Sequence, residues 1–425
     1  MAAWPRAVYS HAMTDIESAV SAPDTRTPLS YPGVVRLLLS RSASSLAYQM
    51  QTVAIGWQIY ALTHRPLSLG LLGLAQFLPM VLLIFVAGHA ADRFDRRRIA
   101  AACQVVETLG AACLAVCSIL HALTPALIYA LVALLGAARA FEAPCMQALL
   151  PSLVPPSLFP RAAAMSSSLF QTMTIIGPSA GGLLYGLGAP VPYAVCACMF
   201  AVAAICASLL QPGVRRPREK VSLDAVFGGL SFIRARPAIL GAISLDLFAV
   251  LLGGATALLP VYASDILHAG PFALGLLRAA PAVGALGVSL LLARRPIGGR
   301  AGALMFAAVG LFGIATIVFG LSRSLPLSIA ALAVLGGADV VSVVVRSSLV
   351  QLQTPDEMCG RVSAVNMLFI GTSNQLGEFE SGTLAAMIGP VAAVVLGGVG
   401  TLAVALLWMR LFPTLRRLDR LQGLS

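Results

Sequence analysis

A small set of ionisable residues interrupts the long apolar stretches of this 425-residue chain, and such residues could bind and release protons. The set comprises Arg139, Glu142, Asp246, Asp339, Glu378 and Glu380. A charged side chain is costly inside hydrocarbon, so each is a functional candidate that should have a partner. Asp246 is the leading candidate for carrying a proton because it lies about nine residues into an apolar stretch, ~13 Å from its start. The alternative is a structural acid that stays hydrogen-bonded.

Arg139 and Asp339 lie 200 residues apart and carry opposite charges. One interpretation is that they meet across a central cavity, where protonation of Asp339 would weaken the pair and shift a conformational equilibrium. The other interpretation is local, because Glu142 stands three residues after Arg139, on the same face of a helix. The sequence leaves both interpretations open.

The remaining charged residues of the apolar stretches are harder to assign. Glu378 and Glu380 are two residues apart, so on a helix they point in different directions and cannot both face one cavity. One of them is a candidate for titration. Glu107 and Arg278 are interpreted as members of structural ion pairs.

A mixed polar and apolar stripe recurs at helical spacing near the start of the chain. It consists of Tyr48, Gln51, Ile55 and Gln58. Such a stripe suits the lining of a site for a neutral or amphipathic small molecule. Core packing explains it equally well.

The stretches that carry these residues are long enough to cross a membrane. Hydrophobic residues make up 58% of the chain and charged residues 11%, a balance too apolar for a soluble protein. A spanning helix needs roughly 20 mostly apolar residues. The hydropathy pattern predicts an all-α integral membrane protein with twelve transmembrane helices, near 34–62, 68–90, 99–120, 124–144, 161–188, 190–211, 238–262, 272–293, 302–321, 326–350, 361–389 and 390–412.

The cationic residues predict the orientation of these helices. Fifteen Lys or Arg residues fall in the even-numbered connections and two, Arg65 and Arg323, in the odd-numbered ones. Cations resist translocation, so both termini are expected in the cytoplasm of a bacterial cell, with the chain in its inner membrane. The same distribution explains the net charge of +11 without a nucleic-acid partner, since the charges form no continuous face.

The predicted helices divide into two halves. We expect a cytoplasmic tail at 1–30, a six-helix bundle at 31–211, a cytoplasmic linker at 212–237, a second six-helix bundle at 238–412 and a tail at 413–425. Short matches separated by 200 residues, such as Leu135-Gly136 with Leu335-Gly336, indicate an internal repeat. The eight cysteines form no ligand-like cluster, so neither a metal site nor a cofactor is predicted.

A charge cluster follows the second predicted helix and carries a family resemblance. It resembles the loop signature of the major facilitator superfamily, Gly-x-x-x-Asp-Arg-x-Gly-Arg-Arg/Lys-Arg/Lys, through Gly88, Asp92, Arg93, Arg96 and Arg97. Asp95 stands where that pattern has glycine. Glycine permits close helix approach, and the aspartate can cap a helix or pair with an arginine, so we expect a conformational latch. A simple topology anchor is the alternative.

A second motif lies in the fifth predicted helix. Gly177, Pro178, Gly181 and Gly182 resemble the core of a motif found in antiporter branches of the superfamily. Proline removes a backbone hydrogen bond and small residues permit close packing, which predicts a hinge, with ordinary tight packing as the alternative. The embedded Gly-x-Ser-x-Gly is not interpreted as a hydrolase motif, because that motif requires a strand, a sharp turn and a helix.

The resemblance covers residues 34–412, and the first four helices resemble the branch that contains bacterial siderophore exporters such as the exporter of enterobactin. It implies a monomeric secondary active transporter in which helices 1, 4, 7 and 10 line a central cavity. We therefore predict a proton-coupled exporter of a small amphipathic molecule, a siderophore or a drug, that works by alternating access. A nutrient importer or facilitator with the same fold is the alternative, and a non-transporting receptor is less favoured because the linker is too short for an output domain. ATP-driven pumping and enzymatic activity are not predicted, since the chain has one lysine and no phosphate-binding loop.

Overall fold

The computed structural model describes residues 27–155, 157–211, 223–295 and 299–418. Most of the tail predicted at 1–30 lies outside these residues, as do parts of the predicted linker and of the tail at 413–425. Within the described residues the chain is helical and contains no strand, as the composition predicts. Many helices begin with proline in the first turn, where the missing N–H costs no hydrogen bond.

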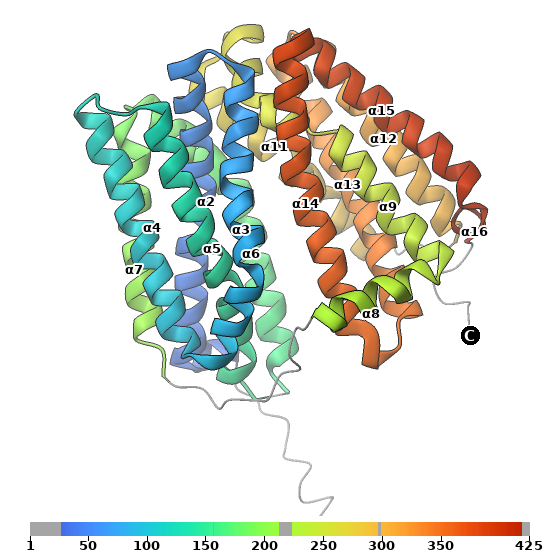
Figure 1. The fold of residues 1–425 in the computed structure, drawn as a ribbon, viewed down its shortest axis with the longest axis horizontal. Coiled ribbons are helices and arrows are strands. Elements are labelled where there is room, and N and C mark those ends of the chain that lie inside the picture. The colour runs from blue at the N-terminus through green and yellow to red at the C-terminus, as the bar shows by residue number, and fades with distance from the viewer. Residues whose placement is uncertain (1–26, 156, 212–222, 296–298, 419–425) are drawn as a thin grey trace, which may run out of the picture.

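The N-terminal half is one group of long helices, on the left of Figure 1. After a short 3₁₀ turn, η1 (Pro28–Ser30), it contains α2 (Pro32–Thr63), α3 (Pro66–Arg93), α4 (Arg96–Ile119), α5 (Pro125–Leu153), α6 (Phe159–Gly186) and α7 (Pro190–Ser208).

The C-terminal half begins with a short helix, α8 (Leu223–Arg234), which packs against α14 and α9 at the lower end of the molecule in Figure 1. The other elements are α9 (Pro237–Leu252), η2 (Ala255–Leu258), α10 (Leu259–Val261), η3 (Tyr262–Ile266), α11 (Gly270–Arg294), α12 (Ala301–Leu321), α13 (Leu325–Gln353), α14 (Asp356–Ile388), α15 (Pro390–Leu411) and α16 (Pro413–Arg416). The two halves follow one plan: α5 and α13 each have 29 residues and begin 200 residues apart.

The helix predicted at 238–262 is not continuous. It ends at Leu252 and continues as a 3₁₀ turn, a single α turn and a π turn. The break coincides with Gly253, Gly254 and Pro260, which are poor helix formers. Gly254 also permits a close contact, because a Cβ there would lie 2.6 Å from the carbonyl oxygen of Gly377 in α14.

Nine helical segments of the described residues are long and apolar enough to cross a membrane. The long helices outside this set are α2, α6 and α14, which have 32, 28 and 33 residues and carry more polar side chains. The predicted count of twelve spanning helices therefore remains a prediction for these three.

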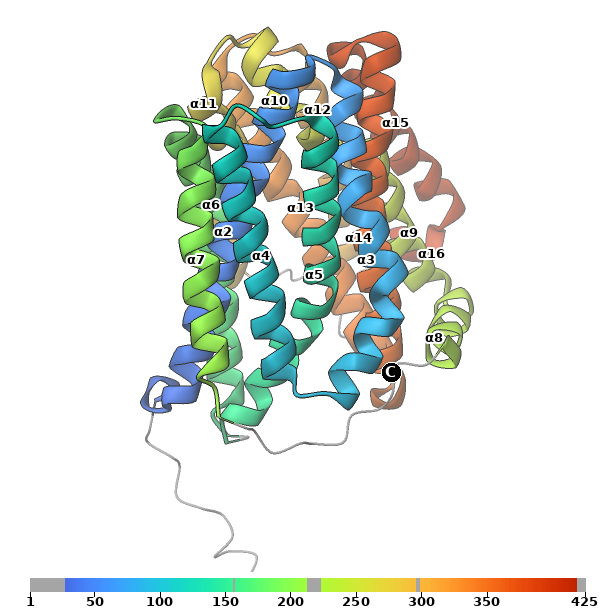
Figure 2. The same cartoon turned by 60° about the vertical axis from the view of Figure 1, so that its left-hand side comes forward.

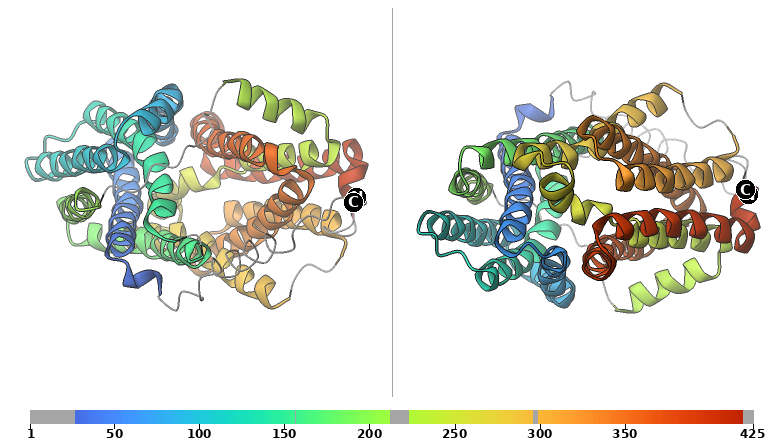
Figure 3. Two further views of the ribbon diagram at one scale, coloured as in Figure 1. Left: turned by 90° about the horizontal axis from the view of Figure 1, so that it is seen from below. Right: turned by 90° about the horizontal axis from the view of Figure 1, so that it is seen from above.

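The two halves meet chiefly through two helix pairs, α6 with α11 and α3 with α14, and α2 also contacts α10 and α11. Glycines allow both contacts: a Cβ at Gly275 would lie 2.7 Å from the carbonyl oxygen of Pro178, and one at Gly382 would lie 2.8 Å from the Cα of Gly70. All these residues lie toward one end of their helices, at the top of Figure 1. From that end the halves diverge downward, as Figures 1 and 2 show, and Figure 3 shows them from below and from above. We call the end with the glycine contacts the closed end.

Candidate functional site

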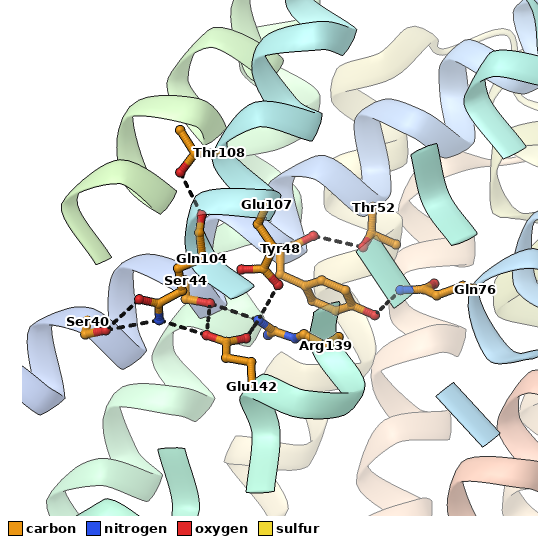
Figure 4. Close-up of polar contacts among 10 residues, drawn as sticks. All are labelled: Ser40, Ser44, Tyr48, Thr52, Gln76, Gln104, Glu107, Thr108, Arg139 and Glu142. Atoms are coloured by element: carbon orange, nitrogen blue, oxygen red, sulfur yellow. Dashed lines mark hydrogen bonds and ion pairs between the residues drawn. The ribbon is translucent and has the colours of Figure 1, made fainter. Parts of the chain in front are cut away.

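A charged cluster lies inside the N-terminal half, between α4 and α5 (Figure 4). Arg139 of α5 pairs with Glu142 of the same helix, with 2.6 Å between Nη1 and Oε2. It also pairs with Glu107 of α4, with 3.5 Å between Nη1 and Oε1. Both glutamates are almost fully buried. One guanidinium therefore faces two acids.

Glu142 is the better satisfied of the two acids. Its Oε1 accepts hydrogen bonds from the Ser44 hydroxyl of α2 and from Gln104 Nε2 of α4, each 2.8 Å long, and its Oε2 accepts from Arg139. Gln104 is positioned in turn by a 3.1 Å hydrogen bond to Ser40. These are the partners that an ionised carboxylate needs in a buried position.

In this conformation Arg139 has the local one of its two predicted partners. The structure shows the local pair with Glu142, and Arg139 forms no ion pair with Asp339 among the described contacts. The physical reason is that two carboxylates of the same half already surround the guanidinium. Glu107 has the charged neighbour that the sequence predicted, because its Oε1 lies 3.5 Å from Nη1 of Arg139.

A small cavity adjoins the cluster within the N-terminal half. Its polar lining consists of Tyr48, Gln51, Thr52, Gln76 and Glu107. The free space of about 40 Å³ has room for roughly three water molecules. Gln51 Nε2 and Glu107 Oε2 are buried there without a hydrogen-bond partner. Two polar groups that need partners thus adjoin a space large enough for water.

Tyr48, Gln51 and Ile55 of the predicted stripe on α2 line the cavity beside Glu107, whereas Gln58 does not. The Tyr48 ring lies under the Arg139 guanidinium, 4.4 Å from its carbon to the ring centroid, and its hydroxyl accepts a 2.9 Å hydrogen bond from Gln76. Gln58 instead accepts a 2.5 Å hydrogen bond from Tyr185 and lines a separate cavity near the ends of α4 and α7. Neighbouring helices therefore divide the stripe, and its role in substrate binding stays a prediction.

The C-terminal half contains its own buried ion pair, between Asp246 of α9 and Arg346 of α13. Asp246 shares a cavity of about 10 Å³, room for at most about one water molecule, with Asp339 and Ser342. Asp339 lies two helical turns before Arg346, yet it makes no hydrogen bond or ion pair in the described part of the chain. Of the two aspartates, Asp246 is paired and Asp339 keeps its bonding capacity free.

Arg346 was not among the candidate residues predicted from the sequence. The signal that could have found it is its place inside an apolar helix, seven residues after Asp339, where both side chains fall on one face. A search for cations in the predicted span 326–350 would have identified it as the partner that a buried acid requires.

The two glutamates of α14 face different surroundings, as their spacing predicts. Glu378 lies against α3, since a Cβ at Gly73 would be 2.8 Å from its Oε2. Glu380 accepts a 3.4 Å hydrogen bond from its neighbour Ser381. Arg278 of α11 lies close enough to Glu378 for an electrostatic interaction, although no ion pair between them is among the described contacts and its buried Nε has no hydrogen-bond partner.

The loop between α3 and α4 is organised by Asp95, the residue that departs from the superfamily pattern. Asp95 caps α4 by accepting a 3.0 Å hydrogen bond from the backbone N–H of Arg97, and it pairs with the Arg97 side chain at 2.5 Å between Oδ2 and Nη2. The hydrogen bond from the Arg97 side chain lowers the pKa of Asp95. Arg97 also donates to the carbonyl of Leu210, and Arg96 donates to that of Ala91. The loop is thus tied to the end of α7.

Other members of the predicted latch belong to α3. Gly88 and Arg93 lie in the last turns of α3, and the side chain of Asp92 lies outside the described residues. A Cβ at Gly88 would meet nothing within 4 Å. The close helix approach expected at Gly88 is absent in this conformation, because the two halves diverge at this end.

The predicted hinge motif lies in two helix contacts. A Cβ at Gly181 would be 2.7 Å from the backbone oxygen of Met50 in α2, and one at Gly177 would be 2.5 Å from the Cβ of Gln49. Gly182 touches α11. α6 remains helical through Pro178. The structure therefore assigns a packing function to the glycines, and a hinge remains a prediction.

A further contact between the halves was not anticipated from the sequence. The Tyr60 hydroxyl near the end of α2 donates a hydrogen bond to Asp265 in η3. Both residues lie at the closed end, beside the contact of Gly56 with Pro260. Nothing in their sequence spacing, 205 residues apart, indicated this pair.

Comparisons with known proteins agree with this architecture. The family described as transmembrane secretion effector matches residues 24–422. The enterobactin exporter EntS of Citrobacter koseri is 28% identical over 401 residues, which are 91% of this chain and 93% of that protein. EntS of Escherichia coli O1:K1 / APEC is 27% identical over 401 residues, with the same coverage.

Solved structures share the fold at low sequence identity. A bacterial homologue of the human lysosomal transporter Spinster, inward-facing and occupied, matches with a TM-score of 0.72 and 14% identity over 90% of this chain and 97% of that one. A bacterial homologue of the iron transporter ferroportin matches with a TM-score of 0.66 and 16% identity over 90% and 98%. The chain therefore belongs to the transmembrane secretion effector family, a group of secondary transporters within the major facilitator superfamily.

Proposed function

We propose that this inner-membrane transporter is a proton-coupled exporter of a small amphipathic molecule, with a siderophore as the first substrate to test. Support for export comes from the relatives named as enterobactin exporters, which match 91% of the chain. Support for alternating access comes from the contact of the two halves at one end and their divergence at the other. With both termini in the cytoplasm, as the cation distribution predicts, the closed end faces the periplasm.

The observation that carries the coupling is the free carboxyl group of Asp339. It lies beside the Asp246–Arg346 pair and shares a cavity with Asp246. An ionised Asp339 competes with Asp246 for the single guanidinium, whereas a protonated Asp339 does not. Protonation therefore changes how α13 is bonded to α9, a difference that can bias which side is open.

The experiment is uphill transport of enterobactin in inverted membrane vesicles energised by a proton gradient. We expect Asp339→Asn to reduce accumulation roughly tenfold, within the 5–150-fold range of a typical coupling energy, while exchange of substrate without a gradient persists. Ser342→Ala is the matched control, since it changes the same cavity without removing an acid. Its accumulation should equal that of the unmodified protein.

The alternatives predict other outcomes. Accumulation by Asp339→Asn at the level of the Ser342→Ala control would exclude Asp339 as the coupling acid. Gradient-independent flux of substrate in both directions by the unmodified protein would favour a facilitator. The absence of any flux in vesicles that still bind the compound would favour a receptor.

A further inference from the structure

From the geometry of the N-terminal cluster we infer that Glu107 is a proton-binding site: its carboxyl group holds one proton at neutral pH and exchanges it through the adjoining water-sized cavity. Nothing in the proposed export requires this site, because it lies within the N-terminal half, away from Asp339. Its ligand is the proton itself.

The count of charges is the first step of the argument. Arg139 carries one positive charge and faces two carboxylates, Glu107 and Glu142, at 3.5 and 2.6 Å. The other cation nearby, Arg41 of α2, interacts electrostatically with Glu142 and Arg139, but its guanidinium donates a 2.8 Å hydrogen bond to Ser166 and forms no ion pair with either glutamate among the described contacts. With both acids ionised, the guanidinium of Arg139 would therefore face two almost fully buried negative charges. Such an arrangement is unfavourable in a low-dielectric interior and favours one bound proton.

The hydrogen bonds decide which acid holds the proton. Glu142 accepts from Ser44, Gln104 and Arg139, which leaves it the bonding pattern of an ionised carboxylate. Glu107 has only the longer contact from Arg139 to Oε1, and its Oε2 has no partner. A protonated Oε2 would be a hydrogen-bond donor. In Figure 4 the polar contact drawn for Glu107 is the one with Arg139.

The cavity supplies the path for exchange. It is lined by Glu107 and by Gln51, whose Nε2 is the other buried polar atom there without a partner. With room for roughly three waters, it can hydrate both groups at once. Gln51 is 3% exposed and Glu107 is 2% exposed, so these waters would be their main polar partners.

The charged and titratable groups around Glu107 favour a proton over a metal ion. They are Arg139 and Glu142 of α5, Cys103 of α4 and Tyr48 of α2, with Arg41 of α2 acting on Glu142 and Arg139, while α3 and α7 contribute uncharged residues to the cavity. The Arg139 guanidinium lies 3.5 Å from Glu107 and would repel a sodium ion at the same carboxyl group. A proton needs one oxygen and no coordination shell.

Infrared spectroscopy of the purified full chain in lipid nanodiscs tests the inference. The unmodified protein should show the carbonyl band of a protonated carboxylic acid at pH 7, and Glu107→Gln should remove one acid's share of it. Glu142→Gln should remove the same share, because Arg139 is then balanced by an ionised Glu107. Asp339→Asn is the control and should keep the Glu107 contribution, which ¹³C-labelled glutamate distinguishes from aspartate.

The absence of a glutamic-acid band in the unmodified protein would overturn the inference, and so would a band that is unchanged in Glu107→Gln. If Glu107→Gln does not fold, a band that is unchanged in Glu142→Gln would overturn it instead. Thermal stabilisation by sodium chloride but not by choline chloride, lost in Glu107→Gln, would replace the proton with a metal ion. The proposed export is judged separately, by vesicle transport in Asp339→Asn. A glutamic-acid band together with transport that does not depend on the proton gradient would support the proton site at Glu107 and contradict the proposed proton-coupled export.

Discussion

Asp95 illustrates how a single residue can depart from a family pattern and still organise the loop around it. The superfamily pattern has glycine at this position, which suits a tight turn. Here an aspartate caps the next helix and binds the arginine two residues later. Side-chain hydrogen bonds therefore fix the turn in place of backbone freedom.

Substitutions at Asp95 should separate the cap from the charge. Asp95→Ala should lower the free energy of unfolding by about 1 kcal/mol through loss of the cap, and Asp95→Asn by less, because asparagine also caps helices. These differences can be measured by thermal unfolding in detergent at pH 7.

The pH dependence follows from the lowered pKa of Asp95 in the folded protein. The stabilisation from ionised Asp95 is fully present above its unfolded pKa of about 3.9 and is lost as the pH falls through the lower folded value. The difference between the unmodified protein and Asp95→Asn should therefore shrink in that acidic range. A difference that stays constant from neutral pH to pH ~3 would show that the charge contributes nothing.

At the residue scale the sequence indicated which buried charges need explaining but not all of their partners. Arg139 and Glu142 are three residues apart on one helix, so their pairing was among the predicted interpretations. Glu107 and Arg346 bind residues far away in sequence, and only tertiary packing brings those pairs together. The cavity beside Glu107 likewise depends on several helices and has no signature in any one of them.

At the element scale, α6 gains its position from glycines that fit against two neighbours. Gly177 and Gly181 lie against α2, and Gly182 lies against α11 of the other half. A side chain at Gly182 would collide with the backbone of Pro271. The contact between the halves therefore depends on the absence of a methyl group.

Gly182→Ala should shift the protein away from the conformation described here. We expect a longer distance between spin labels placed on the two halves at the closed end, measured by double electron–electron resonance. Gly186→Ala is the matched control, because it lies on the same helix and a Cβ there meets nothing within 4 Å. Equal distance distributions in the two variants would mean that the α6–α11 contact adapts without moving the halves.

The predicted spans identified helices better than they identified helix ends. The span at 124–144 corresponds to α5, which continues to Leu153, and Cys145, Met146, Leu149 and Leu150 of its last turns are buried in a hydrophobic cluster. The span at 238–262 contains a break that hydropathy cannot detect, since glycine and proline there are flanked by apolar residues. A hydropathy profile measures how apolar a segment is and contains no information on its backbone conformation.

At the scale of the whole molecule, two similar halves are in contact at the closed end and diverge toward the other end. The repeat visible in the sequence predicted the halves, and the helices α5 and α13 match it in length and offset. The sequence could not predict which end is closed, because both conformations of an alternating-access protein share one sequence.

The orientation in the membrane can be tested with a pair of exposed loop residues, Ser324 before α13 and Arg300 before α12. In a background without native cysteines, we expect Ser324→Cys to react with a membrane-impermeant maleimide in intact cells whose outer membrane is permeable to it. Arg300→Cys should react only after the inner membrane is opened. The reverse labelling pattern would mean that the closed end faces the cytoplasm and that this conformation is open to the periplasm.

The glycine contacts at the closed end also have a genetic consequence. Every substitution of a glycine adds side-chain atoms. Substitutions at the glycines that touch the opposite half therefore push the halves apart, and none draws them together; these glycines are Gly70, Gly182, Gly275 and Gly382. Random mutation at these positions therefore biases the transporter in one direction. A suppressor that restores the balance has to arise elsewhere, and a screen for such suppressors would identify the residues that hold the opposite end shut.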